Sequence, residues 1–316
     1  MLTRRGVLLG AAAATASGCA VLGDPPQGAA LAAAAPAGLP PRAELRAVPF
    51  FPQTRYHCGP AALATVLVHA GLPASPDQLA DAVFLPSREG ALQTEMLAAA
   101  RRFGALAVPL TPQLAGLFAE VAAGHAPVVL QNLGLAIAPR WHYAVLVGYD
   151  LAAREVVLRS GTTERELMGF ALFERTWARG VHWAFVAVAP GQLPATAGEA
   201  DAVQAAIGFE RVAAPAAALR VYDSLVARWP DNLLAGLGQG NTRFAAGDPR
   251  GAAGAFERVA AQHDSAAAWH NLAAVRSRLD EPAQARAAAE RALRKAQRDE
   301  PVWRDAAERL LRELPP

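Results

Sequence analysis

The last part of the sequence repeats itself, and an internal repeat constrains the fold more than any single motif does. Asp248-Pro249 aligns with Glu281-Pro282 at an offset of 33 residues. A weaker copy lies 34 residues upstream, where Tyr222 aligns with Phe256. Small residues in such copies let paired helices approach closely, and large residues fill the grooves between pairs. We predict an all-α domain over residues 199–316, with about three units and an amphipathic capping helix.

The last unit carries the clearest pattern, with Trp269, Leu272 and Ala273 in a Trp-x-x-Leu-small arrangement. This pattern resembles the tetratricopeptide repeat. The resemblance implies antiparallel helix pairs that bind a protein partner on a concave face. An alanine-rich helical bundle is the alternative, and neither reading assigns chemistry to these residues.

The N-terminus reads MLTRRGVLLGAAAATASGCA, a short basic region followed by an apolar stretch too short to span a bilayer. This pattern predicts export. Small residues lead directly into Cys19, which resembles a lipobox, and the resemblance implies a lipoprotein signal peptide at 1–19 with lipid on Cys19. An ordinary signal peptide is the alternative. Arg4-Arg5 also resembles a twin-arginine signal, and the choice of export route stays open.

Residues 20–44 are rich in Pro, Gly and Ala without periodicity, so we expect a flexible tether between the lipid anchor and the first domain. The residue after Cys19 is Ala20 rather than aspartate. For a lipoprotein of a Gram-negative cell, this implies the periplasmic face of the outer membrane.

Charge and residue spacing exclude several classes of function. The 316 residues carry 30 Lys and Arg against 28 Asp and Glu, so the chain offers no electrostatic case for binding nucleic acid. The seven histidines and two cysteines show none of the close pairs that zinc sites use, and no Gly-rich phosphate loop occurs. We therefore predict neither a metal nor a cofactor.

Cys58 is the one cysteine beyond the first twenty residues, and it directly precedes Gly59-Pro60. Because proline favours the first turn of a helix, Cys58 is expected at a helix N-terminus, where the helix dipole lowers a thiol's pKa. Such a nucleophile needs a histidine as its proton partner. The candidate is His142, at the start of an alternating strand, and His182 is second.

Two stretches carry a family resemblance, VPFFPQTRYHCGPAALATVL around Cys58 and HYAVLVGYD from His142. They resemble the papain-like cysteine peptidases that trim double-glycine leader peptides from bacteriocins, here without a transporter attached. The resemblance implies an α+β papain-like domain over residues 45–190. It also implies that Cys58 is the nucleophile, His142 the general base and Gln53 a donor to the oxyanion.

The third catalytic position departs from the family pattern. Family members place Asp or Asn at the start of the next strand, but this chain has EVVLRSGTTE, with Ser160 at the corresponding position. Asp150 comes too early and is expected to open a turn. A serine hydroxyl is a neutral and weaker partner for an imidazolium, so Ser160 is a candidate for orienting His142.

The sequence therefore predicts an exported, membrane-anchored cysteine peptidase that cleaves a peptide or protein, with a repeat domain that recruits a protein partner. The alternative is a scaffold of the cell envelope whose peptidase fold has decayed into a peptide-binding module. The serine at position 160 is the main support for that alternative.

Overall fold

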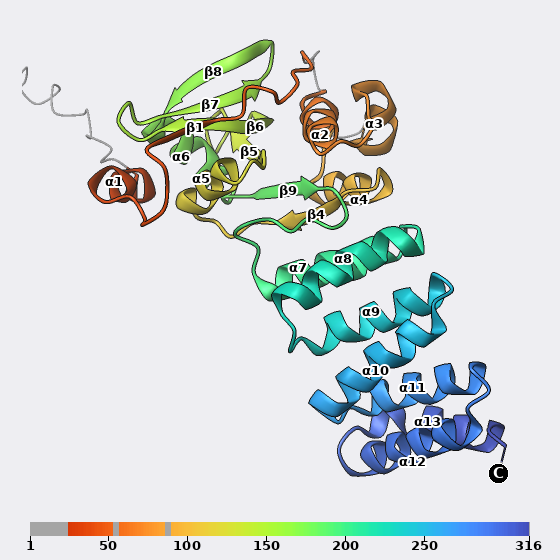
Figure 1. Cartoon of the computed structure of the whole chain (residues 1–316). Helices are drawn as coiled ribbons and strands as arrows, with labels where there is room; N and C mark the ends of the chain where they lie inside the picture. Colours follow the sequence, from red (N-terminus) through yellow and green to blue (C-terminus); the bar gives the residue numbers. More distant parts are fainter. Residues whose placement is uncertain (1–24, 53–56, 86–89, 316) are drawn as a thin grey trace, which may run out of the picture.

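The computed structural model describes residues 25–52, 57–85 and 90–315. A domain of mixed sheet and helix comes first, and a stack of helices follows it (Figure 1). The last strand of the first domain ends at Val188, and the first helix of the stack begins at Glu199. The chain thus combines an α+β unit with an all-α unit.

One antiparallel sheet forms the centre of the first domain. Its strands run in the order β4-β9-β5-β6-β7-β8, and β1 pairs with the last residues of β6. The bounds are β1 (Arg42–Glu44), β4 (Leu106–Pro109), β5 (Val128–Asn132), β6 (Trp141–Asp150), β7 (Glu155–Ser160), β8 (Thr163–Gly169) and β9 (Ala184–Val188). A separate two-stranded ladder joins β2 (Phe84–Leu85) to β3 (Gly90–Ala91).

Helices cover both faces of this sheet. One face packs against α2 (Cys58–His69), α3 (Pro76–Val83) and α4 (Gln93–Arg102), and the other against α1 (Pro26–Ala33), α5 (Leu114–Ala122) and α6 (Phe170–Arg179). Successive side chains of a strand point to opposite faces, so β6 gives Tyr143 and Val145 to the α2 core and Ala144 to the other. The residues from Gly59 to Leu67 are all buried, which makes α2 the central helix.

The N-terminal segment differs from the expected tether over residues 20–44. From Pro26 the chain forms α1, and it then forms β1, which pairs with β6. The N–H groups of Gln27 and Gly28 donate to the buried Glu174 carboxylate at 2.9 and 2.6 Å, and Leu31 is buried. Composition does not reveal this docking, because it is made by one leucine, two backbone N–H groups and the Gln27 side chain, which bonds to the backbone of Pro112 and Leu114.

A buried carboxylate joins the first domain to the segment before the helical stack. Glu120 of α5 is fully buried and accepts hydrogen bonds from the N–H groups of Ala195 and Thr196, the Thr196 hydroxyl, and Nδ1 of His125 at 2.7 Å. Burial acts to raise the pKa of Glu120, but the hydrogen bonds from His125 and Thr196 hold that pKa below its ordinary value. The connecting segment is therefore fixed to the sheet domain at this point.

Three successive helix pairs and a short cap make up the second domain (Figure 1). The pairs are α7 (Glu199–Glu210) with α8 (Pro215–Arg228), α9 (Leu233–Ala245) with α10 (Pro249–His263), and α11 (Ala266–Arg278) with α12 (Pro282–Arg298). A 3-10 turn at Pro301–Trp303 and α13 (Arg304–Glu313) follow. The first helices of the pairs begin at residues 199, 233 and 266, which is the offset of 34 and then 33 residues found in the sequence.

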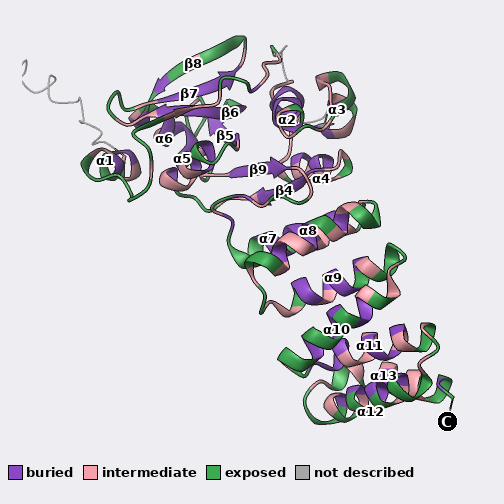
Figure 2. Cartoon of the chain, viewed as in Figure 1, coloured by how far each residue is buried: buried purple, intermediate pink, exposed green. Residues whose placement is uncertain are grey.

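The stack is continuous with the sheet domain through its core. Side chains of α7, α8 and α9 pack with those of β4 and β9 in a single apolar cluster. Colouring by burial shows the buried stripes of these helices turned toward their neighbours (Figure 2). The two domains therefore share a packed junction.

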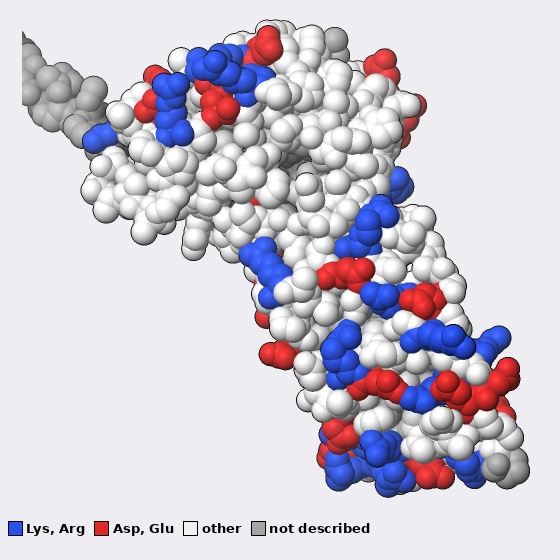
Figure 3. All heavy atoms as spheres, viewed as in Figure 1, with Lys and Arg blue, Asp and Glu red and all other residues white. Residues whose placement is uncertain are grey.

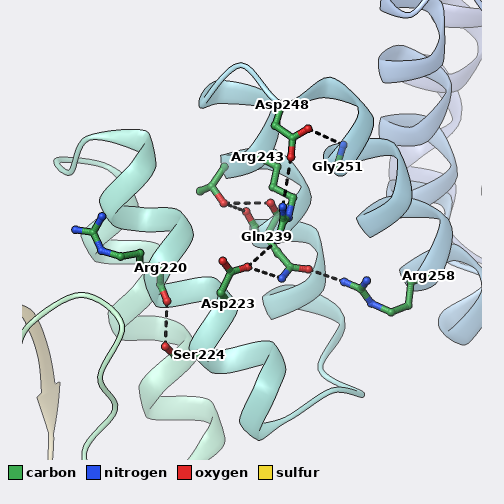
Figure 4. Close-up of polar contacts among 10 residues, drawn as sticks. Arg220, Asp223, Ser224, Gln239, Arg243, Asp248, Gly251 and Arg258 are labelled. Carbon is green, nitrogen blue, oxygen red and sulfur yellow. Dashed lines mark hydrogen bonds and ion pairs between the residues drawn. The ribbon is translucent and has the colours of Figure 1, made fainter.

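A polar network also crosses three helices of the stack (Figure 4). Gln239 of α9 donates to Asp223 of α8 at 2.6 Å and accepts from Arg258 of α10. Arg243 bonds to both Asp223 and Asp248, and Asp248 caps α10 by accepting from Gly251 N–H at 2.8 Å. Because these residues satisfy one another, we assign the network a structural role in holding α8, α9 and α10 in register.

Charges of both signs alternate over the helices on the face shown in Figure 3. This face therefore has no large region of one sign over the stack. Within the part of the chain that the structure describes, none of the helices combines the length and apolar character needed to cross a bilayer.

Candidate active site

Cys58 is the first residue of α2, as the Gly-Pro signal predicts. The thiol is partly exposed, and it lies where α2 meets the start of β6. Gly59 fits this position because a Cβ there would come 2.8 Å from the Cβ of Ala91. Local sequence thus places the thiol at the end of a rigid, buried helix.

The immediate neighbour of the thiol on β6 is the backbone N–H of Tyr143, the residue after His142. Burial raises the pKa of the Cys58 thiol, while the N–H groups of Tyr143, Gly59 and Cys58 itself act in the opposite direction. The net direction is upward, so the expectation of a lowered thiol pKa is wrong for this resting structure. Desolvation of the thiol raises its pKa more than the N–H groups at the helix N-terminus lower it.

His142 is the second residue of β6 and is half-buried. Its Nε2 lies 2.9 Å from the hydroxyl oxygen of Ser160, which is the last residue of β7. Burial lowers the pKa of His142, the Glu166 carboxylate opposes this and Arg140 adds to it. The imidazole is therefore neutral near pH 7 and able to accept a proton.

The structure brings two of the four predicted catalytic residues into direct contact, His142 and Ser160. No hydrogen bond joins Cys58 to His142 within the described residues, and the thiol instead meets the backbone one residue further along β6. The contact through Nε2 leaves Nδ1 as the ring nitrogen not held by Ser160. Gln53 and the lipidation candidate Cys19 both lie outside the described residues.

His182, the second candidate base, lies on the face of the sheet that α6 covers. The alternation of β6 places His142 on that face as well, with Ala144, while Tyr143 is on the face of α2. The His182 ring packs edge-on against Trp177 of α6 with centroids 4.7 Å apart, and its backbone has φ 53°. Asp150 accepts from the N–H groups of Ala152 and Ala153 at 2.9 and 3.0 Å. Asp150 thus opens a turn, as expected, and is not beside the imidazole.

The sequence did not single out the backbone N–H of Tyr143 beside the thiol. Every non-proline residue carries such a group, so no residue type signals it. It also did not single out Gln131 of β5, which pairs directly with His142 across the sheet. Only strand register reveals that pairing.

The raised thiol pKa predicts the pH dependence of alkylation. Because only the thiolate reacts and a raised pKa moves its formation to higher pH, Cys58 should react with iodoacetamide slowly at pH 7. Its rate should rise with a midpoint above about 8.5, the free-thiol value. The measurement is the alkylation rate across pH in a chain lacking residues 1–19, in which Cys58 is the single cysteine.

The same chain unfolded in guanidinium chloride is the control and should titrate as an ordinary thiol. Reactivity that persists near pH 5 in the folded chain would contradict a neutral resting thiol. It would show instead that an ion pair with His142 forms before substrate arrives.

Comparison with known proteins gives a family match for most of the first domain. Residues 45–179 match the family described as "Peptidase_C39 like family". Among solved structures, a "putative C39-like peptidase" from Bacillus anthracis is 20% identical, with a TM-score of 0.39 over 46% of this chain and 97% of the other. No curated protein matches the chain. The family match supports a papain-like cysteine peptidase domain of the C39-like type in the first part of this chain.

Proposed function

We propose that the chain is an exported, lipid-anchored cysteine peptidase that hydrolyses a peptide or protein with Cys58 as nucleophile. The observation that carries the proposal is the position of the thiol. Cys58 begins the central helix and lies against the residue next to a half-buried, neutral histidine, inside a region that matches C39-like peptidases.

The proposed reaction is acyl transfer in two steps. His142 accepts the thiol proton as the sulfur of Cys58 attacks the peptide carbonyl, and it then gives that proton to the leaving amine. Water attacks the resulting thioester, His142 takes a proton from that water, and the thiol is restored as the acid product leaves. Ser160 holds the imidazole through Nε2. Gln53 has the oxyanion role that the family resemblance implies.

The remaining sequence features set the proposed location and partner. Cys19 would carry the lipid and hold the protein at the periplasmic face of the outer membrane. The helix pairs, whose offset and Trp-x-x-Leu-small pattern resemble tetratricopeptide repeats, would bind the protein that is cleaved or an envelope partner.

Ser160 in place of an acid supports a second candidate, a peptide-binding scaffold without hydrolysis. The two are separated by incubating the chain lacking residues 1–19 with a mixed peptide library and reading new termini by mass spectrometry. A peptidase produces new termini, and prior alkylation of Cys58 with iodoacetamide removes them. Cleavage that survives complete alkylation would refute the thiol mechanism, and peptide binding without cleavage would favour the scaffold.

A further inference from the structure

Large apolar side chains stand exposed on the hairpin that joins β5 to β6, residues 133–140, which we call the apolar hairpin. Leu135 is 67% exposed and Ile137 is 92% exposed, and Trp141, the residue after the hairpin, is 56% exposed. Val181, in the turn between α6 and β9, is 76% exposed. Single exposed apolar residues are ordinary, but a group of them at one place marks an interaction surface.

Hydrogen bonds hold the apolar hairpin in one shape. The side-chain oxygen of Asn132 accepts from the N–H groups of Gly134 and Arg140, both at 2.9 Å. Leu135 and Ala138 form a β-bridge across the hairpin. The exposed side chains are therefore presented by an ordered structure.

The turn that carries Val181 lies against the base of the apolar hairpin. Arg179, the last residue of α6, donates from Nε and Nη2 to the carbonyl oxygen of Asn132 at 3.0 and 2.8 Å. The N–H of Leu130 donates to the carbonyl oxygen of Trp183 at 3.1 Å. The two exposed apolar segments thus form one surface at the same end of the sheet.

The shape of this surface favours a lipid bilayer over a peptide as its occupant. With 92% of its surface exposed, Ile137 projects away from the protein and lines no groove. A fluid apolar phase buries a projecting side chain on all sides, whereas an extended peptide covers one side of it. Trp141 at the hairpin base is of the residue type that is enriched where a membrane meets water.

The charges around the surface favour the same occupant. Residues 121–149 and 175–198 contain no Asp or Glu, so no acid of these segments repels anionic headgroups. Arg140 is exposed beside the apolar residues, and a guanidinium in that position can bind a lipid phosphate. Glu166, an acid that acts on His142, belongs to β8, two strands away from β6.

The start of the described chain lies within reach of the same surface. The N–H of Gln27 bonds to Glu174 of α6, and Arg179 follows five residues later, about 7.5 Å along the helix axis. Cys19 precedes Pro26 by seven residues, which span about 25 Å at most. A lipid on Cys19 and the apolar hairpin can therefore enter one bilayer.

We propose that the apolar hairpin, with Trp141 and Val181, inserts into the headgroup region of a phospholipid bilayer and is a second membrane contact beside the lipid on Cys19. This inference rests on the proposed function. His142 directly follows Trp141, so the contact holds the proposed catalytic histidine close to the lipid surface. The substrate is then a peptide segment that lies at that surface.

The test measures binding to vesicles of phosphatidylethanolamine and phosphatidylglycerol by co-sedimentation. It uses the chain lacking residues 1–19, which keeps every described residue and carries no lipid of its own. We expect the wild-type chain to bind, and Ile137→Gln and Leu135→Gln each to lower the partition coefficient about tenfold, because each removes a side chain from the apolar phase. A wild-type chain that stays in the supernatant would overturn the proposal.

Val302→Gln is the matched control, because Val302 is 85% exposed in the helical domain and is not part of the surface. It should bind vesicles as the wild type does, and a loss equal to that of Ile137→Gln would make the effect one of general hydrophobicity and refute the proposal. Unchanged vesicle binding by Ile137→Gln, with a raised KM for a soluble peptide, would assign the hairpin to the substrate instead.

The lipid on Cys19 is checked separately, by the intact mass of the full chain extracted from membranes. A mass without acyl groups would refute the lipid anchor of the proposed function. It would leave the vesicle result standing, because that result comes from a chain that never carries the lipid.

Discussion

Replacing Cys58 with alanine is expected to abolish peptide cleavage by this chain. The sulfur forms the bond to the substrate carbonyl, and the alanine methyl cannot, so the acyl-enzyme route is lost entirely. Alanine has a high helix propensity, and position 58 is not fully buried, so the substitution removes little core packing. We therefore expect α2 to remain folded. The measurement is kcat/KM on a substrate identified from the peptide library, with the far-ultraviolet circular dichroism of the variant as the check on folding.

His142→Ala should reduce the same kcat/KM by roughly 10³-fold or more, because the thiol would then have to ionise without a base. The double variant should be no slower than Cys58→Ala alone, since residues that act as one unit give non-additive losses. Ser160→Ala should cost less than either, because it removes a neutral acceptor and leaves the proton transfer in place. Losses that simply add would mean that Cys58 and His142 do not act in one step.

His182→Ala is the matched histidine control. His182 packs edge-on against Trp177 of α6, which gives it a structural role, so its replacement should leave kcat/KM within a few-fold of wild type. A collapse of activity in this variant, with His142→Ala remaining active, would transfer the role of the base to His182. Local composition alone could not choose between these two histidines, because an apolar stretch follows each of them.

Features with a local cause could be predicted from the sequence. Gly-Pro after Cys58 predicts the start of α2, and the alternation after His142 predicts β6. The 33-residue offset predicts where the helix pairs begin. Each of these depends on propensity or periodicity within a short window, which is what a sequence displays directly.

Features with a non-local cause could not be predicted. The docking of α1 depends on Glu174, which is 147 residues from Gln27 along the chain. The direction of the Cys58 pKa depends on how much water the surrounding side chains exclude, and that is a property of the packed core. The pairing of Gln131 with His142 depends on strand register. Long-range packing decides all three.

The second large effect concerns α9, which carries three glycines in its interior, at positions 236, 238 and 240. Glycine inside a helix costs about 0.5–1 kcal/mol relative to alanine, so three of them require a packing reason. The reason is close approach of side chains from neighbouring helices, which is Val259 of α10 at Gly236 and an aromatic ring at each of the other two. A Cβ at Gly238 would overlap the ring of Tyr222 on α8, and a Cβ at Gly240 would overlap the ring of Phe256 on α10. Both rings are 1% exposed and have little room to move.

Gly238→Ala and Gly240→Ala are each expected to destabilise the helical domain by about 1–3 kcal/mol, the usual range for overpacking, despite the better helix propensity of alanine. Gly238→Ala should have a further consequence, because the Tyr222 hydroxyl donates to Glu210 of α7 at 2.7 Å and a displaced ring would break that bond. The measurement is urea unfolding followed by circular dichroism, with the midpoint and slope compared between variants.

Gly254→Ala is the control within the same stack. Gly254 lies in the interior of α10 and is exposed, and a Cβ there would meet no atom within 4 Å. Propensity alone then decides, so this variant should be more stable by about 0.5–1 kcal/mol. If all three substitutions stabilise the chain, the close approach of the rings to α9 is wrong. If Gly254→Ala stabilises it and the other two destabilise it, the glycines of α9 are what allow α8 and α10 to pack against that helix.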